Sequence, residues 1–403
     1  MLAAIRRFPY ESPINPILLI LWTVITAQAL EVARPFASHM VLPHDVVIPL
    51  HGRASAGSVV KVRFGAIVQT TICHPDGRWR LELPAMKANH QPMTLEISCG
   101  EDQMVLHDLL VGEVWLCSGQ SNMDFPLQRA INGKEQLQRP ANPMMRFHSL
   151  TGWATSAQAF QERDRHRLRE ENFFQGTWQT DEPEARGAQS AVAWWFAEQR
   201  IRDTGRPVGI VENAVGGSGT EAWISPEMLQ SRADYRDLLR ESWIEHPKIS
   251  PWARQRAKQQ IGHMAHVSHP FRPGFLYQSG ISWWRDFPFT AVIWYQGETN
   301  AEIPDMAWNS RLLQDLMTSW RRGLGQPELP FFIVELPRIG GNDPLRQYWP
   351  EYRLAQQNAI KNTTHAYRVV SMDLGWDQPD VHPPDKKPLA LRVAETVKKQ
   401  GPQ

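Results

Sequence analysis

The stretch WLCSGQSNMDF, residues 115–125, joins a short apolar run to five small or polar residues. Trp115, Leu116 and Cys117 are typical of a buried strand, whereas residues 118–122 would pack poorly in a core. In open sheets of parallel strands, ligands bind beyond the carboxyl ends of the strands. We therefore expect the polar residues after this strand to belong to a functional site.

The chain from residue 109 onward alternates further buried runs with helical stretches. Four more core strands are expected at 208–214, 290–296, 330–336 and 367–373. Helical periodicity covers 191–203, with Ser190 as the N-cap and Gly205 as the stop, and it covers 306–323 as well. Strands alternating with helices predict an α/β domain of three layers, α/β/α, around a parallel sheet.

The residues before this domain have a different texture. Between residues 40 and 108, short strand-like runs recur with turn signals between them, which predicts a small antiparallel β-sandwich. The expected division is a signal peptide at 1–29, a β-sandwich domain at 30–108 and a catalytic domain at 109–403. Within the last of these, residues 128–188 are polar and irregular, and we expect an elaborated loop region there.

The N-terminus has the features of a secretory signal. Arg6 and Arg7 precede an apolar run at 17–25 that is too short to span a bilayer, and Ala27-Gln28-Ala29 fits a cleavage site. Cleavage after Ala29 would give a secreted or periplasmic protein without a stable membrane span. An uncleaved membrane anchor is the alternative.

Composition excludes some partners and favours others. A net charge of +1 and scattered Lys and Arg give no electrostatic case for nucleic acid. Most of the 17 Trp must be core, but this excess over 7 Tyr slightly favours a carbohydrate ligand, because flat rings stack on sugars. No Cys/His spacing resembles a zinc site. Cys73 and Cys99 lie in neighbouring strand-like segments, and whether they pair stays open, whereas Cys117 is expected to be a small buried residue.

Chemically useful residues follow four of the expected strands. They are Gly119-Gln120-Ser121-Asn122, the glycine cluster 216–219, the turn Gly297-Glu298-Thr299-Asn300, and Asp377, Asp380 and His382. A serine hydroxyl becomes a useful nucleophile when a neutral histidine takes its proton, and a carboxylate must orient that histidine. Neutral N–H donors must then stabilise the oxyanion that forms. These residue types together predict acyl transfer by serine.

Longer blocks around these residues resemble the sialate O-acetylesterase family of the SGNH/GDSL hydrolases. The blocks are GEVWLCSGQSNMDFPL (112–127), GRPVGIVENAVGGSGTEAWIS (205–225), VIWYQGETNAE (292–302) and DVHPPDKKPLALRVA (380–394). FASHMVLPHDVVIPLHGRA (36–54) is similar to that family's small β-domain. The resemblance covers nearly all of the expected mature chain and implies an SGNH-type catalytic domain.

The resemblance implies a role for each matched position. Ser121 is the nucleophile and His382 is the base, with Asp380 as its carboxylate partner. The oxyanion donors are Ser121 N–H, Gly217 (or the adjacent Gly216) and Asn300, while Gln120, Gln296 and Glu298 are candidates for contacting the substrate or supporting such contacts. Many relatives place the aspartate three residues before the histidine, where this chain has Pro379, so Asp377 and Asp373 stay open as alternatives to Asp380.

The expected activity is that of a serine carboxylesterase that removes O-acetyl groups from carbohydrates without a metal or organic cofactor. The family implies O-acetylated sialic acid, and acetylated xylan or another polysaccharide is the alternative. A non-catalytic carbohydrate-binding protein on a hydrolase scaffold is the alternative from a different class. The sequence does not indicate an oligomeric state. Leu389, Val393 and Val397 predict a buried face on a last helix, whose first turn, with Lys386 and Lys387, is expected to be solvated.

Overall fold

The computed structural model describes residues 28–152, 157–264 and 266–401. The expected signal peptide therefore lies outside the described residues, apart from Gln28 and Ala29. Within the described ranges, no helix is both long enough and apolar enough to cross a membrane.

The N-terminal part is built from two packed sheets. One contains β1 (Glu31–Val32), β3 (Ile48–Arg53) and β6 (Arg78–Leu83), and the other contains β2 (Val41–Pro43), β4 (Val59–Phe64), β5 (Ile67–Ile72), β7 (Asn89–Cys99) and the first part of β8 (Asp102–Gly119). Leu50 and Leu81 of the first sheet share a core with Val62 and Ile97 of the second. The predicted antiparallel sandwich is confirmed, although the short strand β2 pairs with β8 in parallel. The thiols of Cys73 and Cys99 are free.

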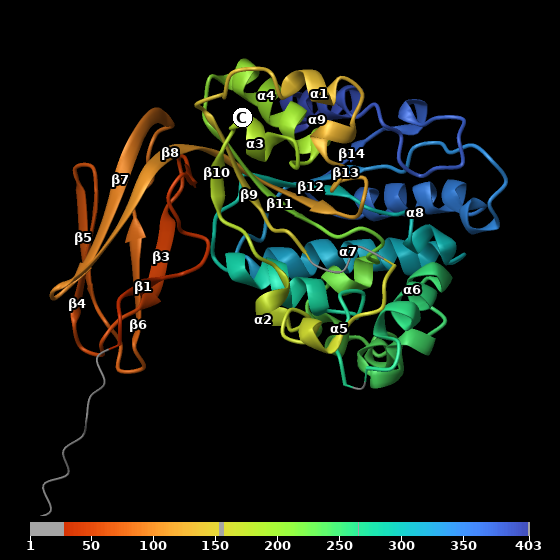
Figure 1. Cartoon of the computed structure of the whole chain (residues 1–403), viewed down its shortest axis with the longest axis horizontal. Coiled ribbons are helices and arrows are strands. Elements are labelled where there is room, and N and C mark those ends of the chain that lie inside the picture. Colours follow the sequence, from red (N-terminus) through yellow and green to blue (C-terminus); the bar gives the residue numbers. More distant parts are fainter. Residues whose placement is uncertain (1–27, 153–156, 265, 402–403) are drawn as a thin grey trace, which may run out of the picture.

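The strand β8 joins the two parts of the molecule. Its residues run without a break across position 108, where the sequence analysis placed a domain boundary. The first half pairs with β7, and the second half is the middle strand of the catalytic sheet (Figure 1). The carboxyl end of β8 therefore lies on the side of the central sheet that faces away from the sandwich.

The central sheet has the order β10-β9-β11-β8-β12-β13-β14. Its further strands are β9 (Met145–Ser149), β10 (Trp178–Thr180), β11 (Val208–Ala214), β12 (Ala291–Tyr295), β13 (Phe331–Val334) and β14 (Ala366–Val369). All neighbouring pairs are parallel except β10 with β9. The five core strands expected from the sequence are all in this sheet.

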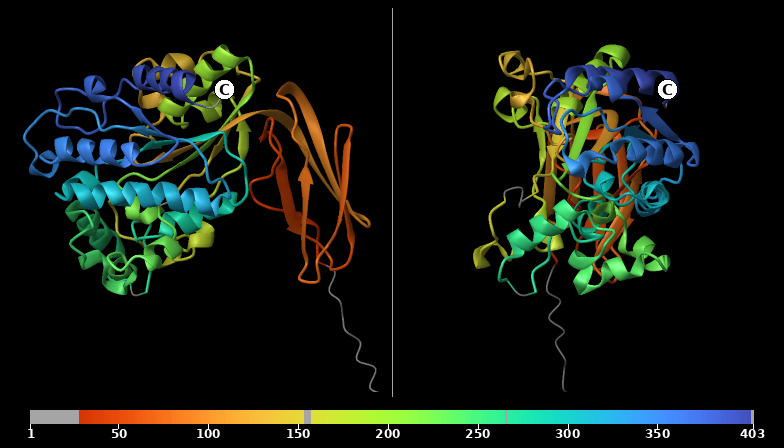
Figure 2. Two further views of the ribbon diagram at one scale, coloured as in Figure 1. Left: turned by 180° about the vertical axis from the view of Figure 1, so that it is seen from behind. Right: turned by 90° about the vertical axis from the view of Figure 1, so that its right-hand side faces the viewer.

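Helices cover both faces of the sheet, as Figures 1 and 2 show. On one face lie α1 (Gly133–Gln136), α3 (Pro183–Arg186), α4 (Ala191–Thr204) and α9 (Lys387–Gln400), and on the other lie α2 (Glu170–Phe173), α5 (Pro226–Ser231), α6 (Pro251–Ile261), α7 (Met306–Gly323) and α8 (Trp349–Lys361). The Ser190 side chain caps α4 by accepting a hydrogen bond from the Ala193 N–H, and Gly205 ends it at a φ of 67°. The predicted three-layer α/β fold is confirmed.

The expectation of loops throughout 128–188 is wrong for two segments, because β9 and β10 extend the central sheet. Polar residues hide β9 in the sequence, since Arg146 and His148 alternate with its apolar residues. Arg146 is buried and paired with Asp108 at 3.0 Å. Burial lowers the pKa of His148 to about 4, so this side chain is neutral in the core. Both polar residues are thus buried in the sheet, Arg146 with a carboxylate partner and His148 as a neutral ring.

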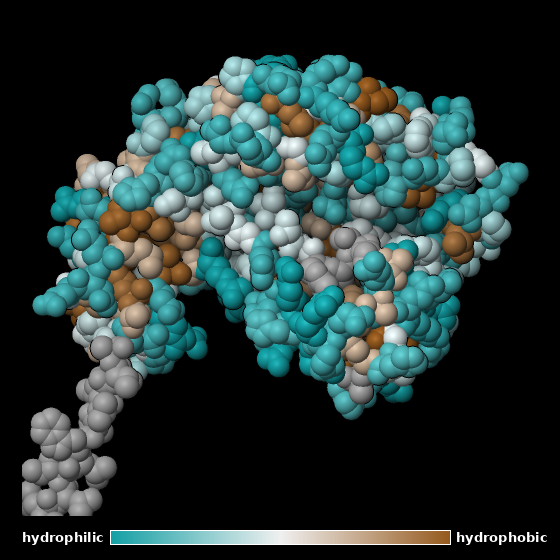
Figure 3. Space-filling model, viewed as in Figure 1, coloured by the Kyte–Doolittle hydropathy of each residue, from teal (hydrophilic) through white to brown (hydrophobic). Residues whose placement is uncertain are grey.

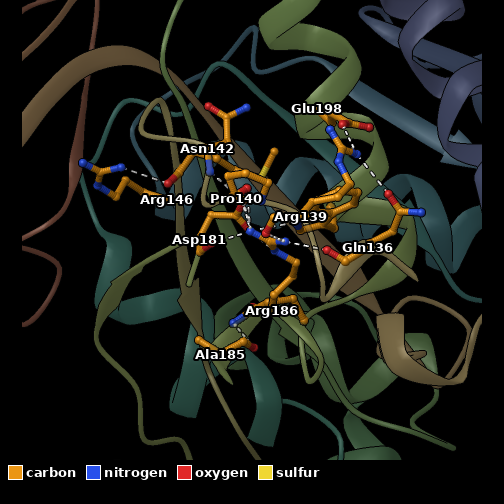
Figure 4. A network of polar contacts seen from close by, with 12 residues as sticks. Gln136, Arg139, Pro140, Asn142, Arg146, Asp181, Ala185, Arg186 and Glu198 are labelled. Carbon is orange, nitrogen blue, oxygen red and sulfur yellow. Dashed lines mark hydrogen bonds and ion pairs between the residues drawn. The ribbon is translucent and has the colours of Figure 1, made fainter. Parts of the chain in front are cut away.

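The rest of this region is organised around one buried guanidinium, shown in Figure 4. Arg186 is fully buried and pairs with Asp181, with 2.8 Å between Nε and Oδ1. Its remaining N–H groups donate to the Asp181 side chain and to backbone carbonyls of Gln136, Arg139, Pro140 and Asp181. Because every donor is used, the guanidinium fixes an irregular segment that has little regular structure of its own.

Most of the tryptophans are buried in the core and are not available to stack on a sugar. Trp79, Trp115, Trp178, Trp195, Trp223, Trp284, Trp294, Trp320 and Trp349 are all fully buried. The weak preference for a carbohydrate that rested on the Trp count is therefore unsupported. Figure 3, in the same view as Figure 1, shows a mostly hydrophilic surface over the part that contains the central sheet. The largest hydrophobic area in this view lies on the N-terminal part.

Candidate active site

The turn after β8 explains the polar residues at 118–122. Gly119 has a φ of 142°, and a Cβ atom there would lie 2.0 Å from the Tyr295 carbonyl oxygen at the end of β12. The next residue donates from its backbone to the same oxygen at 3.1 Å, and Gln120 O accepts from the N–H groups of Met123 and Asp124. This tight turn presents Ser121 beyond the sheet edge, where an apolar side chain would have no core to enter.

The structure brings together three side chains that the sequence analysis expected to meet. Ser121 Oγ lies 2.8 Å from His382 Nε2, and His382 Nδ1 lies 2.8 Å from Asp380 Oδ1. A carboxylate only accepts hydrogen bonds, so His382 carries its proton on Nδ1 and its Nε2 accepts the Ser121 hydroxyl. This tautomer is the one in which a histidine takes a proton from serine.

The competing aspartates have other partners. Asp377 pairs with Arg338 at 3.4 Å, and Asp373 pairs with Arg392. Asp380 also accepts the backbone N–H of His382 at 3.0 Å, and the Asp380 carbonyl accepts from Trp376 Nε1 at 2.6 Å. Of the three candidates, Asp380 alone has a geometry that orients His382.

The glycine cluster after β11 lies against the nucleophile turn. A Cβ atom on Gly216 would lie 3.4 Å from the Ser121 Cβ, so this glycine is the neighbour of Ser121. Gly217 has a φ of 77°, and a Cβ there would lie 2.3 Å from the Trp252 ring. Both the backbone conformation and the available space therefore require glycine at 217.

Asn300 sits in a buried network on the same edge of the sheet. Its side-chain oxygen accepts from the Thr220 backbone at 2.8 Å and from Gln296 Nε2 at 2.6 Å, so its amide nitrogen faces the other way. That nitrogen donates to Glu221 Oε2 at 3.0 Å, and no second acceptor for it is found among the described residues. Burial raises the pKa of Glu221, and the hydrogen bond from Asn300 opposes this shift.

The three auxiliary candidates are buried rather than open to a substrate. Gln296 bonds to Asn300 and to Thr220, while Gln120 Oε1 accepts long contacts of 3.5 and 3.4 Å from Gly297 N and Thr299 N. Glu298 Oε1 accepts a hydrogen bond from Asn122 Nδ2. All three support the turns around the site from inside the protein.

The expected solvation of Lys386 is wrong, because this side chain is 1% exposed. Its ammonium donates to Asn122 Oδ1 and lies 4.8 Å from the centre of the Phe125 ring. Lys387, the next residue, is exposed as expected. Lysines at a helix start are usually solvated. The only sequence signal that Lys386 belongs to the site is its position four residues after His382.

A hollow of about 480 Å³ opens beside the serine. Its lining residues are Ser121, Asp124, Phe125, Pro126, Gln128, Arg129, Ala188 and His382. Gly217 and Asn300 are not among them.

Burial raises the pKa of Asp124 to about 7, and the buried Glu212 near it has a raised pKa for the same reason. The sequence analysis did not name Asp124 or Arg129. Neither residue is needed for acyl transfer by serine, and only the folded structure shows that both line the hollow.

Part of the 128–188 region forms one wall of this hollow. Gln128 N donates to the Gly187 carbonyl at 3.1 Å, and Leu127 N donates to the Gln189 carbonyl at 2.8 Å. These bonds join the segment that carries Arg129 to the residues that directly follow Arg186. The buried guanidinium of Arg186 therefore supports the wall from behind.

A three-layer α/β fold with a serine and a histidine beyond the carboxyl ends of parallel strands is consistent with an SGNH-type carboxylic ester hydrolase. Residues 248–396 match the family described as carbohydrate esterase, sialic acid-specific acetylesterase.

Named relatives and a solved structure are similar to this chain as well. Sialate O-acetylesterase of Mus musculus is 25% identical over 354 residues, which are 80% of this chain and 63% of the mouse protein. The enzyme of the same name from Homo sapiens is 27% identical over 308 residues, which are 72% of this chain and 53% of the human protein. The chain thus spans less than two thirds of the length of these relatives. The crystal structure of a carbohydrate acetylesterase from Xanthomonas citri is 27% identical, with a TM-score of 0.74 over 92% of this chain and 75% of that chain.

Proposed function

We propose that this protein is a serine esterase that removes O-acetyl groups from carbohydrates. The observation that carries the proposal is the 2.8 Å contact between Ser121 Oγ and His382 Nε2 at the mouth of a hollow. The family match over residues 248–396 and the names of the relatives support the same activity. Asp380 holds His382 in the tautomer that the reaction needs.

The proposed reaction has two halves. Ser121 Oγ attacks the acetyl carbonyl carbon while His382 Nε2 takes the hydroxyl proton, and a tetrahedral oxyanion forms. The bond from the carbonyl carbon to the sugar oxygen then breaks, and His382 returns the proton to that oxygen. In the second half, water attacks the acetyl-serine, with His382 again as the base, and acetate leaves.

The proposed oxyanion donors are the Ser121 N–H, Gly217 (or the adjacent Gly216, which lies against Ser121) and Asn300. Asn300 remains a candidate because its amide nitrogen donates one N–H to Glu221, and the other N–H has no partner among the described residues. Loss of one such donor typically costs about 3 kcal/mol of transition-state stabilisation.

For the substrate, we propose a carboxylated sugar ester such as O-acetylated sialic acid in preference to neutral acetylated xylan. Arg129 lines the hollow, and it forms no ion pair with any carboxylate among the described residues. Its guanidinium lies 5.1 Å from the centre of the Phe125 ring, which restricts its orientation. A guanidinium free of a carboxylate partner is suited to bind the carboxylate of a sugar acid.

Acetate release tests the proposal directly. Wild-type protein and Ser121→Ala are each incubated with O-acetylated sialic acid and with acetylated xylan. The proposal predicts release by the wild type, at least about 1,000-fold less by the variant, and a preference for the sialic acid ester. Equal background rates for both proteins would favour the non-catalytic carbohydrate-binding alternative, and a preference for xylan would favour a polysaccharide acetylesterase.

Export is a separate part of the proposal. The pair Arg6-Arg7, the apolar run at 17–25 and the small residues Ala27 and Ala29 support a cleaved signal. N-terminal sequencing of the protein recovered from its native host should give Leu30 as the first residue. Recovery of an intact N-terminus from a membrane fraction would support an anchor instead.

A further inference from the structure

We propose that Asn122, Lys386 and Glu298 form a clamp that positions His382 against Ser121. The proposal rests on the esterase function, but the reaction described above has no step for these three residues. In this clamp the amide of Asn122 lies between a buried ammonium and a buried carboxylate. The same amide also holds the backbone of the loop that carries the base.

The hydrogen bonds of Asn122 define the clamp. Its Nδ2 donates to Glu298 Oε1 and, at 2.8 Å, to the carbonyl oxygen of Val381. Its Oδ1 accepts from Lys386 Nζ. Both N–H groups and the oxygen are thus used. Asn122 directly follows Ser121, and Val381 stands directly before His382, so one side chain connects the two catalytic segments.

The charges of the clamp are deeply buried. Asn122 is 0% exposed, Lys386 is 1% exposed and Glu298 is 2% exposed. No carboxylate among the described residues lies within ion-pair distance of Lys386, so the amide separates the two charges instead of a direct salt bridge joining them. The Lys386 ammonium also lies over the rings of Phe125 and Tyr295, at 4.8 and 5.7 Å from their centres.

Stability alone does not explain such an arrangement. Removing an ammonium and a carboxylate from water costs several kcal/mol for each ion, and an apolar packing of equal volume is often at least as stable. Burial lowers the pKa of Lys386 to about 7, and the nearby charges of Glu298 and Asp380 only partly oppose this shift. Groups perturbed in this way gather at functional sites.

The base loop needs such a support. The side chain of Asp380 is 58% exposed and that of His382 is 30% exposed, so packing alone does not hold Asp380 in place. The Asp380 carbonyl accepts from Trp376 Nε1 within the same loop, and backbone bonds from Gly340 to Gln378 and from Ile131 to Pro384 hold the loop on either side of the catalytic pair. Asn122 is the link that reaches across from the nucleophile turn. A displacement of about 1 Å between reacting groups can lower a rate about 100-fold.

The clamp is tested by a matched pair of lysine variants. Lys386→Met removes the buried ammonium, and Lys387→Met alters the exposed neighbour on the same helix end. The kcat and KM for p-nitrophenyl acetate are measured, together with the rate at which a p-nitrophenyl phosphonate inactivates Ser121. We expect Lys386→Met to lower kcat and the inactivation rate about 100-fold, with KM within about threefold of wild type. Lys387→Met should match wild type in all three.

Two further variants separate positioning from folding. The double variant Lys386→Met/Glu298→Gln leaves the network neutral, and it should recover kcat to within about tenfold of wild type because the introduced glutamine oxygen can still accept from Asn122. Asn122→Ala removes the bond to Val381 but lets Glu298 and Lys386 compensate each other. It should lower kcat like Lys386→Met while the protein stays folded by thermal unfolding.

The outcomes distinguish failure of the clamp from failure of the proposed function. If wild type turns over p-nitrophenyl acetate and folded Asn122→Ala keeps full kcat, the clamp is overturned while the esterase stands. Equal kcat values for Lys386→Met and Lys387→Met would overturn the clamp as well. If wild-type turnover is no faster than that of Ser121→Ala, the esterase proposal fails.

Discussion

At the residue scale, the choice of carboxylate can be tested with two variants that differ only in position. Asp380→Asn should lower kcat/KM at least about 100-fold, because an amide can favour the wrong tautomer of His382. Asp377→Asn is the matched control, since Asp377 faces Arg338 and should leave kcat/KM within about threefold. Turnover of p-nitrophenyl acetate measures both. A selective loss in Asp377→Asn would contradict the assignment of Asp380.

Substrate charge is the second question at this scale. Arg129→Gln should raise the KM for an O-acetylated sialic acid at least about tenfold, because a charge-assisted hydrogen bond is worth about 1.5 to 3 kcal/mol. The rate with p-nitrophenyl acetate, which has no carboxylate, should not change and serves as the control. An equal loss on both substrates would indicate a structural role for Arg129.

At the scale of single elements, the end of β8 depends on one glycine. Gly119→Ala places a Cβ 2.0 Å from a backbone oxygen of β12, and backbone atoms cannot move aside as a flexible side chain can. We expect a loss of at least about 2 kcal/mol in the free energy of unfolding and a larger loss of esterase activity, because the turn carries Ser121.

The control for this variant is Gly205→Ala. Gly205 also has a positive φ, but a Cβ there would meet no atom within 4 Å. This control should cost about 1 kcal/mol, from the backbone conformation alone, and should keep full activity. Equal effects of the two substitutions in urea unfolding would contradict the steric explanation.

The elements that could be predicted from the sequence are those whose burial follows a simple period. The ends of α7 at Met306 and Gly323 and of β11 at Val208 and Ala214 agree with the predicted ranges. The strand β9 could not be found, because buried Arg146 and His148 depend on partners far away in the chain. Local sequence does not show that a charge has a distant partner.

The same distinction holds within the site. Ser121, His382 and the carboxylate candidates could be named because their segments follow predicted strands and resemble the blocks of a known family. Lys386 looked like a solvated helix start, and its burial depends on Asn122, 264 residues earlier. Arg129 belongs to an irregular segment that the Arg186 network fixes. The local sequence therefore shows neither that Arg129 lines the hollow nor that it has no carboxylate partner.

At the scale of the whole molecule, stability should depend on pH through a buried carboxyl group. Burial raises the pKa of Glu212 to about 8, and the charge of Asp124 adds to the shift. Between pH 4.5 and 8 the unfolded chain releases this proton while the folded protein keeps it. The unfolded state therefore binds fewer protons, and the stability contribution of this group falls as pH rises through that window.

The variant Glu212→Gln should remove this pH dependence. A glutamine oxygen can still accept the hydrogen bonds from Ser190 N at 3.0 Å and Ser149 Oγ at 3.4 Å. In urea unfolding, the variant should be similar to wild type at about pH 5 and more stable than wild type by at least about 1 kcal/mol at about pH 8. A variant less stable at the higher pH would show that the native group is ionised there.

The central claim is that Ser121 and His382 act as one unit, and a cycle of alanine variants tests it most directly. Turnover of p-nitrophenyl acetate is measured for wild type, Ser121→Ala, His382→Ala and the double variant. If the two side chains work together, each single variant loses at least about 1,000-fold and the double variant loses no more than the worse single variant. Losses that multiply in the double variant, or turnover that survives in Ser121→Ala, would contradict the account.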